Sequence, residues 1–277
     1  MLSISHLFIY PVKSLGGIDL NSSNVGVRGL EHDRRFLLID ENNRFLTQRE
    51  FPKMALLQTE IKNEELLIFP KQAPSEVFVL PLSPKPSGKN IQVQIWDDEC
   101  LAQLISAEAD KWFSENLKIN CRLVYMPDST KRNVDPKFAM NNETVNFPDA
   151  FPMLIFAQAS LDELNSRLAE KLPIIRFRPN IVFTGGSPFQ EDMMKHFKIN
   201  EIDFYCVKPS ARCVITTTNQ QTGKTGKEPL KTLATFRQKN NKVFFGQNVL
   251  VSGEGKINVG DEIEIIEQFE ESFLTVP

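Results

Sequence analysis

The sequence predicts a β-rich α+β protein built as two β-barrel-like domains with a few short helices. Short runs of β-branched and aromatic residues, bounded by turn residues, recur along the 277-residue chain. Apolar residues at helical spacing occur only once or twice in each half. Residues 128–149 are polar and contain two prolines, so we expect a long loop there that crosses between the two halves.

In the first half, short strands are expected to surround one helix. Residues 3–10 form the first strand, which ends at Pro11. Strict alternation of apolar residues with Gln over residues 91–95 predicts a half-buried strand. Ser106 is expected to cap an amphipathic helix over residues 106–116. The other expected elements are strands over residues 55–61, 66–69, 77–80 and 121–126, a hairpin of residues 36–39 and 44–47, and a loop over 81–88.

The second half shows a similar mixture. Ser160 followed by Glu163 has the spacing of a capping box, which predicts a helix that runs to about Leu172. Residues 214–218 are β-branched and predict a strand that begins after Pro209, because proline cannot donate to a strand ladder. Strands are also expected over residues 153–156, 181–184, 199–208 and 243–251 (broken at Gly246), with a short helix over 231–237 and a hairpin-like pair over 257–266.

The composition excludes several functional classes. A formal net charge of −3 argues against a nucleic-acid-binding protein that works through overall positive charge. No apolar run approaches the roughly 20 residues that a membrane helix needs, and the first residues lack the pattern of a signal peptide. The four cysteines form no C-x-x-C pair, which argues against a zinc ribbon or a thioredoxin-type site. Four cysteines in a chain of this length also argue against a secreted disulfide scaffold. We therefore expect no nucleic-acid partner, no membrane association and a cytoplasmic location.

Residues 208–218 contain the strongest chemical signal. Cys213 directly follows Arg212 at the edge of the predicted strand. A positive neighbour favours the thiolate form of a cysteine, which attacks electrophiles or binds soft metals. The alternative is a small buried core residue, since free cysteines are among the most buried residue types. The other cysteines, Cys100, Cys121 and Cys206, are expected to be structural.

A second candidate site follows the first strand. Lys13 and Ser14 precede two glycines, so this loop allows a ligand to approach closely. The alternative is an ordinary turn with a solvated lysine. Arg34, Arg35 and Arg49 flank the predicted hairpin, where charges usually face solvent. An arginine that points inward beside Lys13 would create an anion-binding site.

A series of motifs occurs in order along the chain. They are residues 10–14 (YPVKS), 29–34 (GLEHDR), 47–49 (TQR), 177–180 (FRPN), 212–213 (RC) with the threonines that follow, 219–223 (NQQTG), 245–248 (FGQN) and 260–261 (GD). This pattern resembles the two-part MOSC proteins, and within them the amidoxime-reducing components and their bacterial relatives. The resemblance implies a MOSC N-terminal β-barrel domain over residues 1–126, a MOSC domain over 127–267 and a C-terminal tail over 268–277.

The resemblance implies a molybdenum cofactor, held as molybdopterin, with Cys213 as the metal ligand and the catalytic residue. Thiolate ligation of a redox metal agrees with the chemistry expected of this cysteine. Residues 149–151 are implied to contact the pterin through their backbone. Relatives often carry serine at the position of Ala211, so only a backbone contact is expected there. The implied cofactor-binding residues are Lys13, Ser14, Arg34, Arg178, Asn180, Ala211, Arg212, Cys213 and Asn248; pyridoxal phosphate has no evident site.

Several of these assignments have structural alternatives. For Arg178 the alternative is an ion pair with a carboxylate. Strand alternation lets only one of Arg34 and Arg35 point inward, and the motif favours Arg34. Asn180 is alternatively a residue that fixes the Arg178 loop through backbone hydrogen bonds.

The resemblance implies an oxidoreductase that reduces small N-hydroxylated compounds, with the metal carrying the redox chemistry. No cysteines of a ferredoxin domain follow, so electrons are expected from a separate reductase or ferredoxin-type protein. Asp149, Asp192 and His196 are candidate general acids, with none singled out. The alternative function is a molybdenum cofactor or sulfur carrier that uses Cys213 without reductase turnover of its own. A third alternative is a β-barrel protein that binds another small anion.

Overall fold

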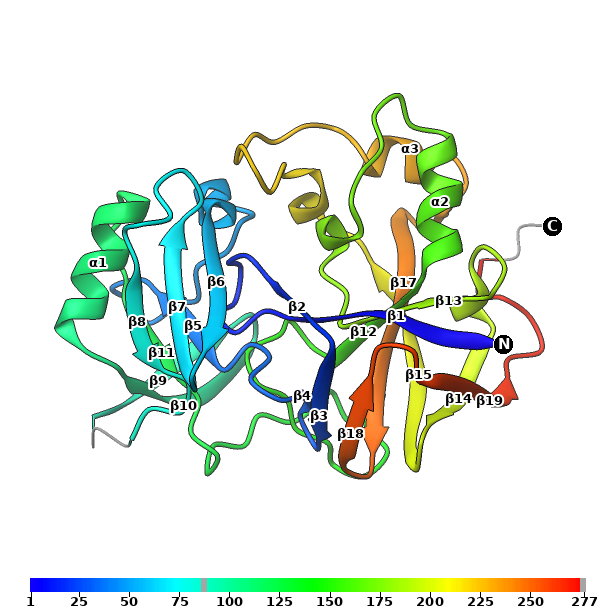
Figure 1. The fold of residues 1–277 in the computed structure, drawn as a ribbon, viewed down its shortest axis with the longest axis horizontal. Helices are drawn as coiled ribbons and strands as arrows, with labels where there is room; N and C mark the ends of the chain where they lie inside the picture. The colour runs from blue at the N-terminus through cyan, green and yellow to red at the C-terminus, as the bar shows by residue number, and fades with distance from the viewer. Residues whose placement is uncertain (86–88, 275–277) are drawn as a thin grey trace.

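The computed structural model describes residues 1–85 and 89–274, and it confirms the predicted β-rich class. An N-terminal lobe on the left of Figure 1 lies beside a strand barrel on the right. None of the helices in the described residues has the length and apolarity that a membrane crossing requires. The α-helices of the described residues are α1 (Ala107–Leu117), α2 (Gln158–Ser166) and α3 (Leu230–Ala234).

The larger lobe is a closed barrel of seven strands. The pairings run in the order β12-β13-β1-β19-β14-β15-β17, and β12 pairs with β17 to close the ring. Closure removes the free edges that an open sheet would expose. The strands are β1 (Leu2–Ile9), β12 (Met153–Ala157), β13 (Ile181–Thr184), β14 (Met194–Ile199), β15 (Ile202–Ala211), β17 (Lys242–Ser252) and β19 (Glu262–Gln268).

The first strand of the sequence completes this barrel. β1 pairs with β13 and β19, although every other strand of the ring begins after residue 152. Apolar side chains such as Ile4, Ile155 and Phe204 form one buried cluster together with Val251. The loop that follows β1 is therefore anchored to the barrel at its start. The predicted domain limits at residues 126 and 267 stay a prediction.

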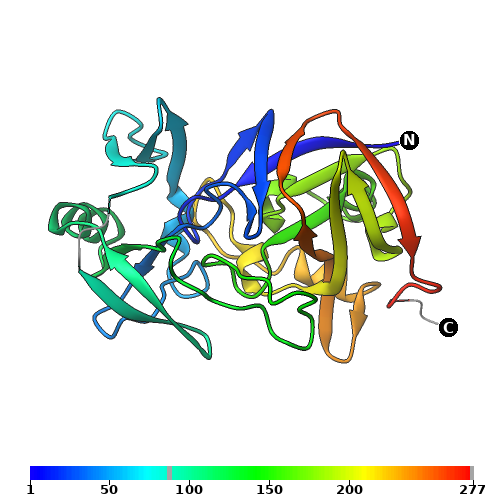
Figure 2. The ribbon, with the colours of Figure 1, turned by 90° about the horizontal axis from the view of Figure 1, so that it is seen from below.

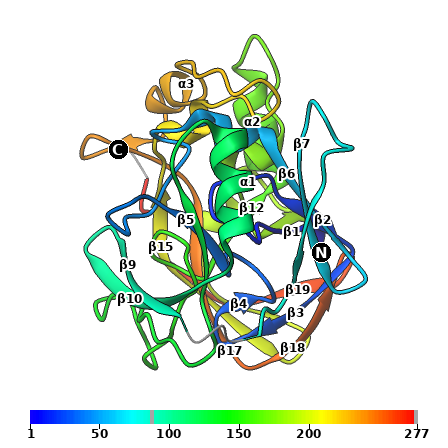
Figure 3. The ribbon, with the colours of Figure 1, turned by 90° about the vertical axis from the view of Figure 1, so that its left-hand side faces the viewer.

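The N-terminal lobe is a half-barrel of two antiparallel sheets. Apolar side chains from both sheets share a core with Ala109, Phe113 and Leu117 of α1, which lies in front in Figure 3. A second cluster includes Val93 and Ala102. As predicted, Ser106 caps α1, because its Oγ accepts a hydrogen bond of 3.1 Å from the Ala109 amide. The sheets are β5 (Phe36–Ile39), β11 (Arg122–Tyr125), β10 (Asp98–Leu104) and β9 (Asn90–Ile95), and β6 (Leu57–Lys62), β7 (Glu65–Pro70) and β8 (Phe78–Pro81).

The polar segment between β11 and β12 contains no helix or strand, as predicted, and it crosses from one lobe to the other (Figure 2). Arg132 holds its last part in place from a buried position. The guanidinium donates to the backbone oxygens of Asn146 (3.1 Å), Pro148 (2.8 Å) and Asp149 (2.9 Å). The remaining short strands are β2 (Ile18–Leu20), β3 (Ser22–Gly26), β4 (Gly29–Leu30), β16 (Gln238–Lys239) and β18 (Gly255–Asn258).

The strand predicted over residues 214–218 is wrong. Val214–Thr217 is a 3₁₀ turn, η4, and the hydroxyls of Thr216 and Thr217 donate to backbone oxygens three residues earlier at 2.9 and 2.8 Å. Threonine favours this turn because its hydroxyl competes with the strand ladder for backbone groups. Pro209 does not precede a strand but lies inside β15, and the register with β17 shifts on both sides of it. Such irregularities are where a sheet tolerates proline.

The predicted capping box at Ser160 is also wrong. Helix α2 begins at Gln158 and ends at Ser166, and Ser160 is buried. The Ser160 Oγ donates to Oε2 of Glu191 (2.8 Å) and accepts from the amide of Phe189 (2.7 Å). Its hydroxyl is therefore used by a distant segment instead of by the helix start.

Three further strand predictions need correction. β17 runs without a break through Gly246. A side chain at this position would collide with the Phe156 ring, and the φ of +83° also favours glycine. Residues 199–208 were predicted as one strand, but they contain the end of β14, the turn after it and the first part of β15. The pair predicted over 257–266 does not form, because β18 pairs with β3 and β19 pairs with β1 and β14. Of the loop predicted over 81–88, residues 86–88 lie outside the described residues.

Candidate functional site

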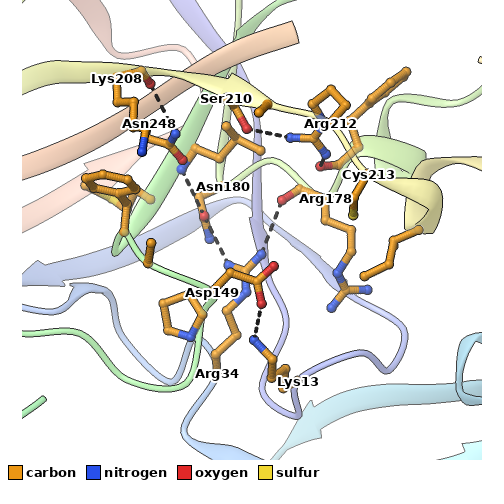
Figure 4. Close-up of a pocket in the computed structure, with 18 of the residues that line it drawn as sticks. Lys13, Arg34, Asp149, Arg178, Asn180, Lys208, Ser210, Arg212, Cys213 and Asn248 are labelled. Carbon is orange, nitrogen blue, oxygen red and sulfur yellow. Dashed lines mark hydrogen bonds and ion pairs between the residues drawn. The ribbon is translucent and has the colours of Figure 1, made fainter. Parts of the chain in front are cut away.

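The structure brings the predicted site residues together in one pocket between the two lobes (Figure 4). The pocket has a volume of about 280 Å³. Its walls come from the loop after β1, the crossing segment, residues 177–180 just before β13, and the end of β15. All nine residues assigned from the sequence line it: Lys13, Ser14, Arg34, Arg178, Asn180, Ala211, Arg212, Cys213 and Asn248.

Cys213 lies two residues after the end of β15, where the chain turns into η4. It is a free, half-buried cysteine, whereas Cys100, Cys121 and Cys206 are free and buried. Burial raises the pKa of Cys100 to about 11 and raises that of Cys206 further. Cys100, Cys121 and Cys206 are therefore buried core residues, whereas Cys213 is the thiol that lines the pocket.

The Arg212 guanidinium binds the backbone of Phe177 and the side chain of Ser210. Nη2 donates to the backbone oxygen of Phe177 (2.6 Å) and Nη1 donates to Oγ of Ser210 (2.9 Å). The third guanidinium nitrogen, Nε, is buried and has no hydrogen-bond partner among the described residues. Burial lowers the pKa of Arg212 to about 10, against the raising effect of Cys213.

Arg34 and Arg178 both lie against the ring of Tyr10. Their guanidinium carbons lie 4.7 and 4.0 Å from the ring centre. Both residues have positive φ angles, +51° and +57°, which are uncommon for side chains of this size. Nη1 of Arg178 donates to the backbone oxygen of Leu15 (2.6 Å), and its Nη2 is buried without a partner among the described residues. Arg178 forms no ion pair in the described part of the chain, so the ion-pair alternative is not found.

The choice of Arg34 over Arg35 is consistent with the structure. Arg34 lines the pocket, where it pairs with Asp33 and donates to Oδ1 of Asn180 (3.2 Å). Arg35 points elsewhere, to the Tyr125 hydroxyl (2.7 Å) and Asp128 (2.7 Å), and lines a separate pocket. Both arginines precede β5, and Arg34 lies in a turn with a φ of +51°, so the turn and not strand alternation sends the two side chains in different directions.

Asn180 and Asn248 tie the pocket wall to the barrel. Asn180 is 1% exposed; its Nδ2 donates to the backbone oxygen of Phe8 (3.1 Å) and its Oδ1 accepts from the Leu154 amide (3.2 Å). Asn180 therefore makes hydrogen bonds to the backbone, as its structural alternative predicted, and it also lines the pocket. Asn248 Nδ2 donates to the backbone oxygen of Lys208 (3.1 Å) and so joins β17 to β15 at the pocket edge.

Lys13 is buried at the base of the pocket and pairs with Asp149. Its Nζ donates to Oδ1 of Asp149 (2.6 Å) and to the backbone oxygen of Phe147 (2.8 Å). Burial lowers the pKa of Lys13 to about 8, against the raising effect of Asp149. Burial opposes the charge on Asp149 as well, but Lys13 and Arg49 outweigh it and hold the pKa of that carboxyl well below its usual range. Lys13 is not a solvated turn lysine.

Lys208 and Ser210 were not predicted as site residues. Arg49 was one of three arginines considered for an anion site beside Lys13, and Asp149 was predicted as a backbone contact and as one of three candidate general acids. Arg49 donates from Nη2 to Oδ2 of Asp149 (2.7 Å). The TQR motif was the available signal for Arg49, but it does not tell which way the side chain points. Of the candidate acids, Asp192 pairs with Arg237 and His196 with Asp203, and neither lines the pocket.

The pocket has more positive than negative side chains. The described lining residues include one carboxylate, that of Asp149, and three of the cations carry buried nitrogens without partners: Arg49 Nη1, Arg178 Nη2 and Arg212 Nε. An unpaired buried donor costs about 1–3 kcal/mol, so these groups fit a ligand that supplies acceptors. An anionic, oxygen-rich group and a metal bound by the Cys213 sulfur match this set. The cations are Lys13, Arg34, Arg49, Arg178, Lys208 and Arg212.

Comparison with known proteins gives matches over most of the chain. Residues 1–120 match the model of the MOSC N-terminal beta barrel domain, and residues 142–264 match that of the MOSC domain. The chain is 29% identical to mitochondrial amidoxime-reducing component 1 of Mus musculus, over 96% of this chain and 83% of that protein. It is 32% identical to mitochondrial amidoxime reducing component 2 of Homo sapiens, over 94% and 82%. It is 30% identical to molybdenum cofactor sulfurase of Oryza sativa subsp. japonica, over 96% of this chain and 35% of that protein.

Proposed function

Because the chain belongs to the MOSC-domain proteins that carry an N-terminal MOSC β-barrel domain, we propose that it is a molybdenum-cofactor-dependent oxidoreductase. Its substrates would be small N-hydroxylated compounds such as amidoximes. One observation carries the proposal. Cys213, the half-buried thiol, lines a pocket whose described side chains leave three buried cationic donors unpaired. The names of the amidoxime-reducing relatives support the choice of substrate class.

In this proposal Cys213 binds the metal through its sulfur, and the cationic residues hold the anionic part of the cofactor. When bound, the cofactor supplies the two-electron reduction of an N–O bond. The free donors of Arg178 and Arg212 would bind its oxygens, and Lys13 would supply positive charge at the base. Ser14, Asn180 and Asn248 line the same surface, and Ala211 offers its backbone. Asp149 stays ionised between Lys13 and Arg49, so it does not store a proton for the reaction.

Electrons would come from a separate reductase or ferredoxin-type protein. The relatives are named amidoxime-reducing components, and the name component supports the proposal that a further protein takes part. The cytoplasmic location expected from the sequence stays a prediction, since those relatives are named mitochondrial.

A second candidate function is a molybdenum cofactor or sulfur carrier. It is favoured by the similarity to a molybdenum cofactor sulfurase and by the partly exposed position of Cys213. In that case the thiol would carry sulfur or hold the cofactor for transfer, without reductase turnover in this chain.

One experiment tests the proposal and separates it from the carrier. Protein purified from a host that makes the cofactor is assayed for molybdenum and for amidoxime reduction with reconstituted electron donors. Cys213→Ala should lose both, whereas Cys100→Ala, the same change at a buried cysteine outside the pocket, should keep both. Full activity in Cys213→Ala would contradict the proposal. A persulfide on Cys213 without molybdenum or turnover would favour the carrier.

A further inference from the structure

Trp96 occupies an unusual position at the turn between β9 and β10. Its φ is +56°, in the left-handed region that bulky residues rarely adopt, and the residue is 45% exposed. Strained backbone and an exposed indole are both unfavourable for folding, and such positions cluster at functional sites. The contacts of this indole show what it supports.

The Trp96 side chain holds Arg49 and Asp149 in fixed positions. The Arg49 guanidinium carbon lies 4.7 Å from the centre of the Trp96 ring, which is a cation–π contact. Trp96 Nε1 donates to Oδ1 of Asp149 (3.3 Å), and Arg49 Nη2 donates to Oδ2 of the same carboxylate (2.7 Å). The edge of Phe45 packs on the indole at 4.9 Å between ring centres. The ring of Trp96 and the hydrogen bond to Asp149 therefore hold the guanidinium of Arg49 in place.

This orientation leaves one donor of Arg49 free inside the protein. Nη1 is buried and has no hydrogen-bond partner among the described residues. Arg49 and Cys213 line the same pocket. Burial lowers the pKa of Arg49, but interactions with Asp149 and Cys213 outweigh this effect and raise it. The free donor therefore belongs to a side chain that shares the pocket with Cys213.

We propose that Arg49 is a ligand-contacting residue, whose free Nη1 group donates to an oxygen of the ligand beside Cys213, and that Trp96 is the positioning residue that orients it. Only the identity of the ligand rests on the proposed function. The competing explanation is that Trp96 and Arg49 merely join the two lobes, with no contact to a ligand.

Inorganic sulfate provides a probe of this donor in the cofactor-free protein. The chain has two tryptophans, and Trp112 stacks on Phe78 in the N-terminal lobe, so Trp112→Phe leaves Trp96 as the single indole reporter. Sulfate binding at Arg49 should change the Trp96 emission in a saturable way. Arg49→Gln in the same background should abolish this change and weaken sulfate binding measured by calorimetry.

The positioning role is tested by a matched pair of variants. Trp96→Phe keeps an aromatic face for the guanidinium and should bind sulfate within about twofold of the parent. Trp96→Leu removes that face and should weaken binding by about threefold to tenfold. Melting temperatures of all variants show whether each is folded, and molybdenum retention in protein from a cofactor-producing host gives a second readout. Trp112→Phe is the control and should change neither the sulfate affinity nor the molybdenum retention.

Two outcomes would overturn the inference. Folded Arg49→Gln protein that binds sulfate and retains molybdenum like its parent would show that Arg49 contacts no ligand. Equal sulfate affinity in Trp96→Leu and Trp96→Phe would show that the indole does not orient Arg49. The result is independent of the proposed reaction, because sulfate binding is measured without turnover. Protein that fails to reduce amidoximes but shows the expected sulfate responses would refute the proposed function and support this inference.

Discussion

Lys13 Nζ and Asp149 Oδ1 lie 2.6 Å apart, and the two side chains differ sharply in exposure: 7% for Lys13 and 45% for Asp149. The lysine comes from the loop after β1, and the aspartate comes from the crossing segment whose backbone Arg132 holds. The counter-charge of a buried cation is therefore supplied from the open side of the pocket. Arg49 shares the same carboxylate.

Removing this carboxylate should destabilise the cofactor-free protein. Asp149→Asn leaves Lys13 and Arg49 without their counter-charge, so we expect the free energy of unfolding to fall by about 1–3 kcal/mol. Denaturant unfolding measures the change. Asp128→Asn removes the exposed partner of Arg35 and should cost less than about 1 kcal/mol. Equal losses in the two variants would argue against a special role for the Asp149 pair.

Anion binding should weaken as the pH rises through about 8. The pKa of Lys13 is lowered to about 8, mainly by burial, so its charge is present below that pH and is lost above it. Sulfate titrations of the cofactor-free protein on either side of pH 8 should show affinity that falls with rising pH. Lys13→Gln should bind more weakly at low pH and lack this fall. A fall of the same size in Lys13→Gln would assign the titration to another group.

Tyr10 should act through its ring and not through its hydroxyl. The ring contacts the guanidinium groups of Arg34 and Arg178, whereas the hydroxyl is buried and has no partner among the described residues. Tyr10→Phe should leave stability within about 0.5 kcal/mol of the parent or raise it. Tyr10→Leu should lose about 1 kcal/mol or more and retain less molybdenum, because both arginines lose an aromatic face. Denaturant unfolding and metal analysis compare the two; a larger loss in Tyr10→Phe would contradict the prediction.

Glu191 should make the protein less stable as the pH rises. Burial, with a smaller effect from Asp192, raises its pKa from 4.5 to about 8. Between these values the folded state keeps a proton that the unfolded state has released, so stability falls with rising pH, by at most about 1.4 kcal/mol per unit. Glu191→Gln should flatten the dependence of the unfolding free energy on pH between 4.5 and 8. Glu201→Gln, at an exposed position, should leave it unchanged.

The residue chemistry of the site was predictable from short motifs. Lys13, Arg178 and Cys213 each stand in a local pattern, and each lies in the pocket. The sequence did not show which of Arg34, Arg35 and Arg49 faces Lys13, nor that the Asp149 carboxylate is the counter-charge of Lys13, because the direction of a loop side chain depends on what packs against it. Trp96, which orients Arg49, is distant from it in the sequence and has no motif of its own.

Local sequence patterns also led to several wrong predictions of secondary structure. The β-branched run after Cys213 suits a strand, but the Thr216 and Thr217 hydroxyls satisfy the backbone in a 3₁₀ turn instead. Ser160 has capping chemistry, yet its hydroxyl is used by Glu191, a residue outside its helix. In both cases the same side chain supports two structures, and tertiary contacts select one.

Patterns among neighbouring residues were enough to predict the β-rich class, the polar crossing segment and the capped α1 helix, and short motifs supplied the residue types of the site. The three-dimensional fold added that β1 closes a barrel with strands from the second half, and that Lys13 meets a carboxylate 136 positions away. Strand pairing and the pairing of buried charges join distant segments, and periodicity along the chain carries no information about which segments meet.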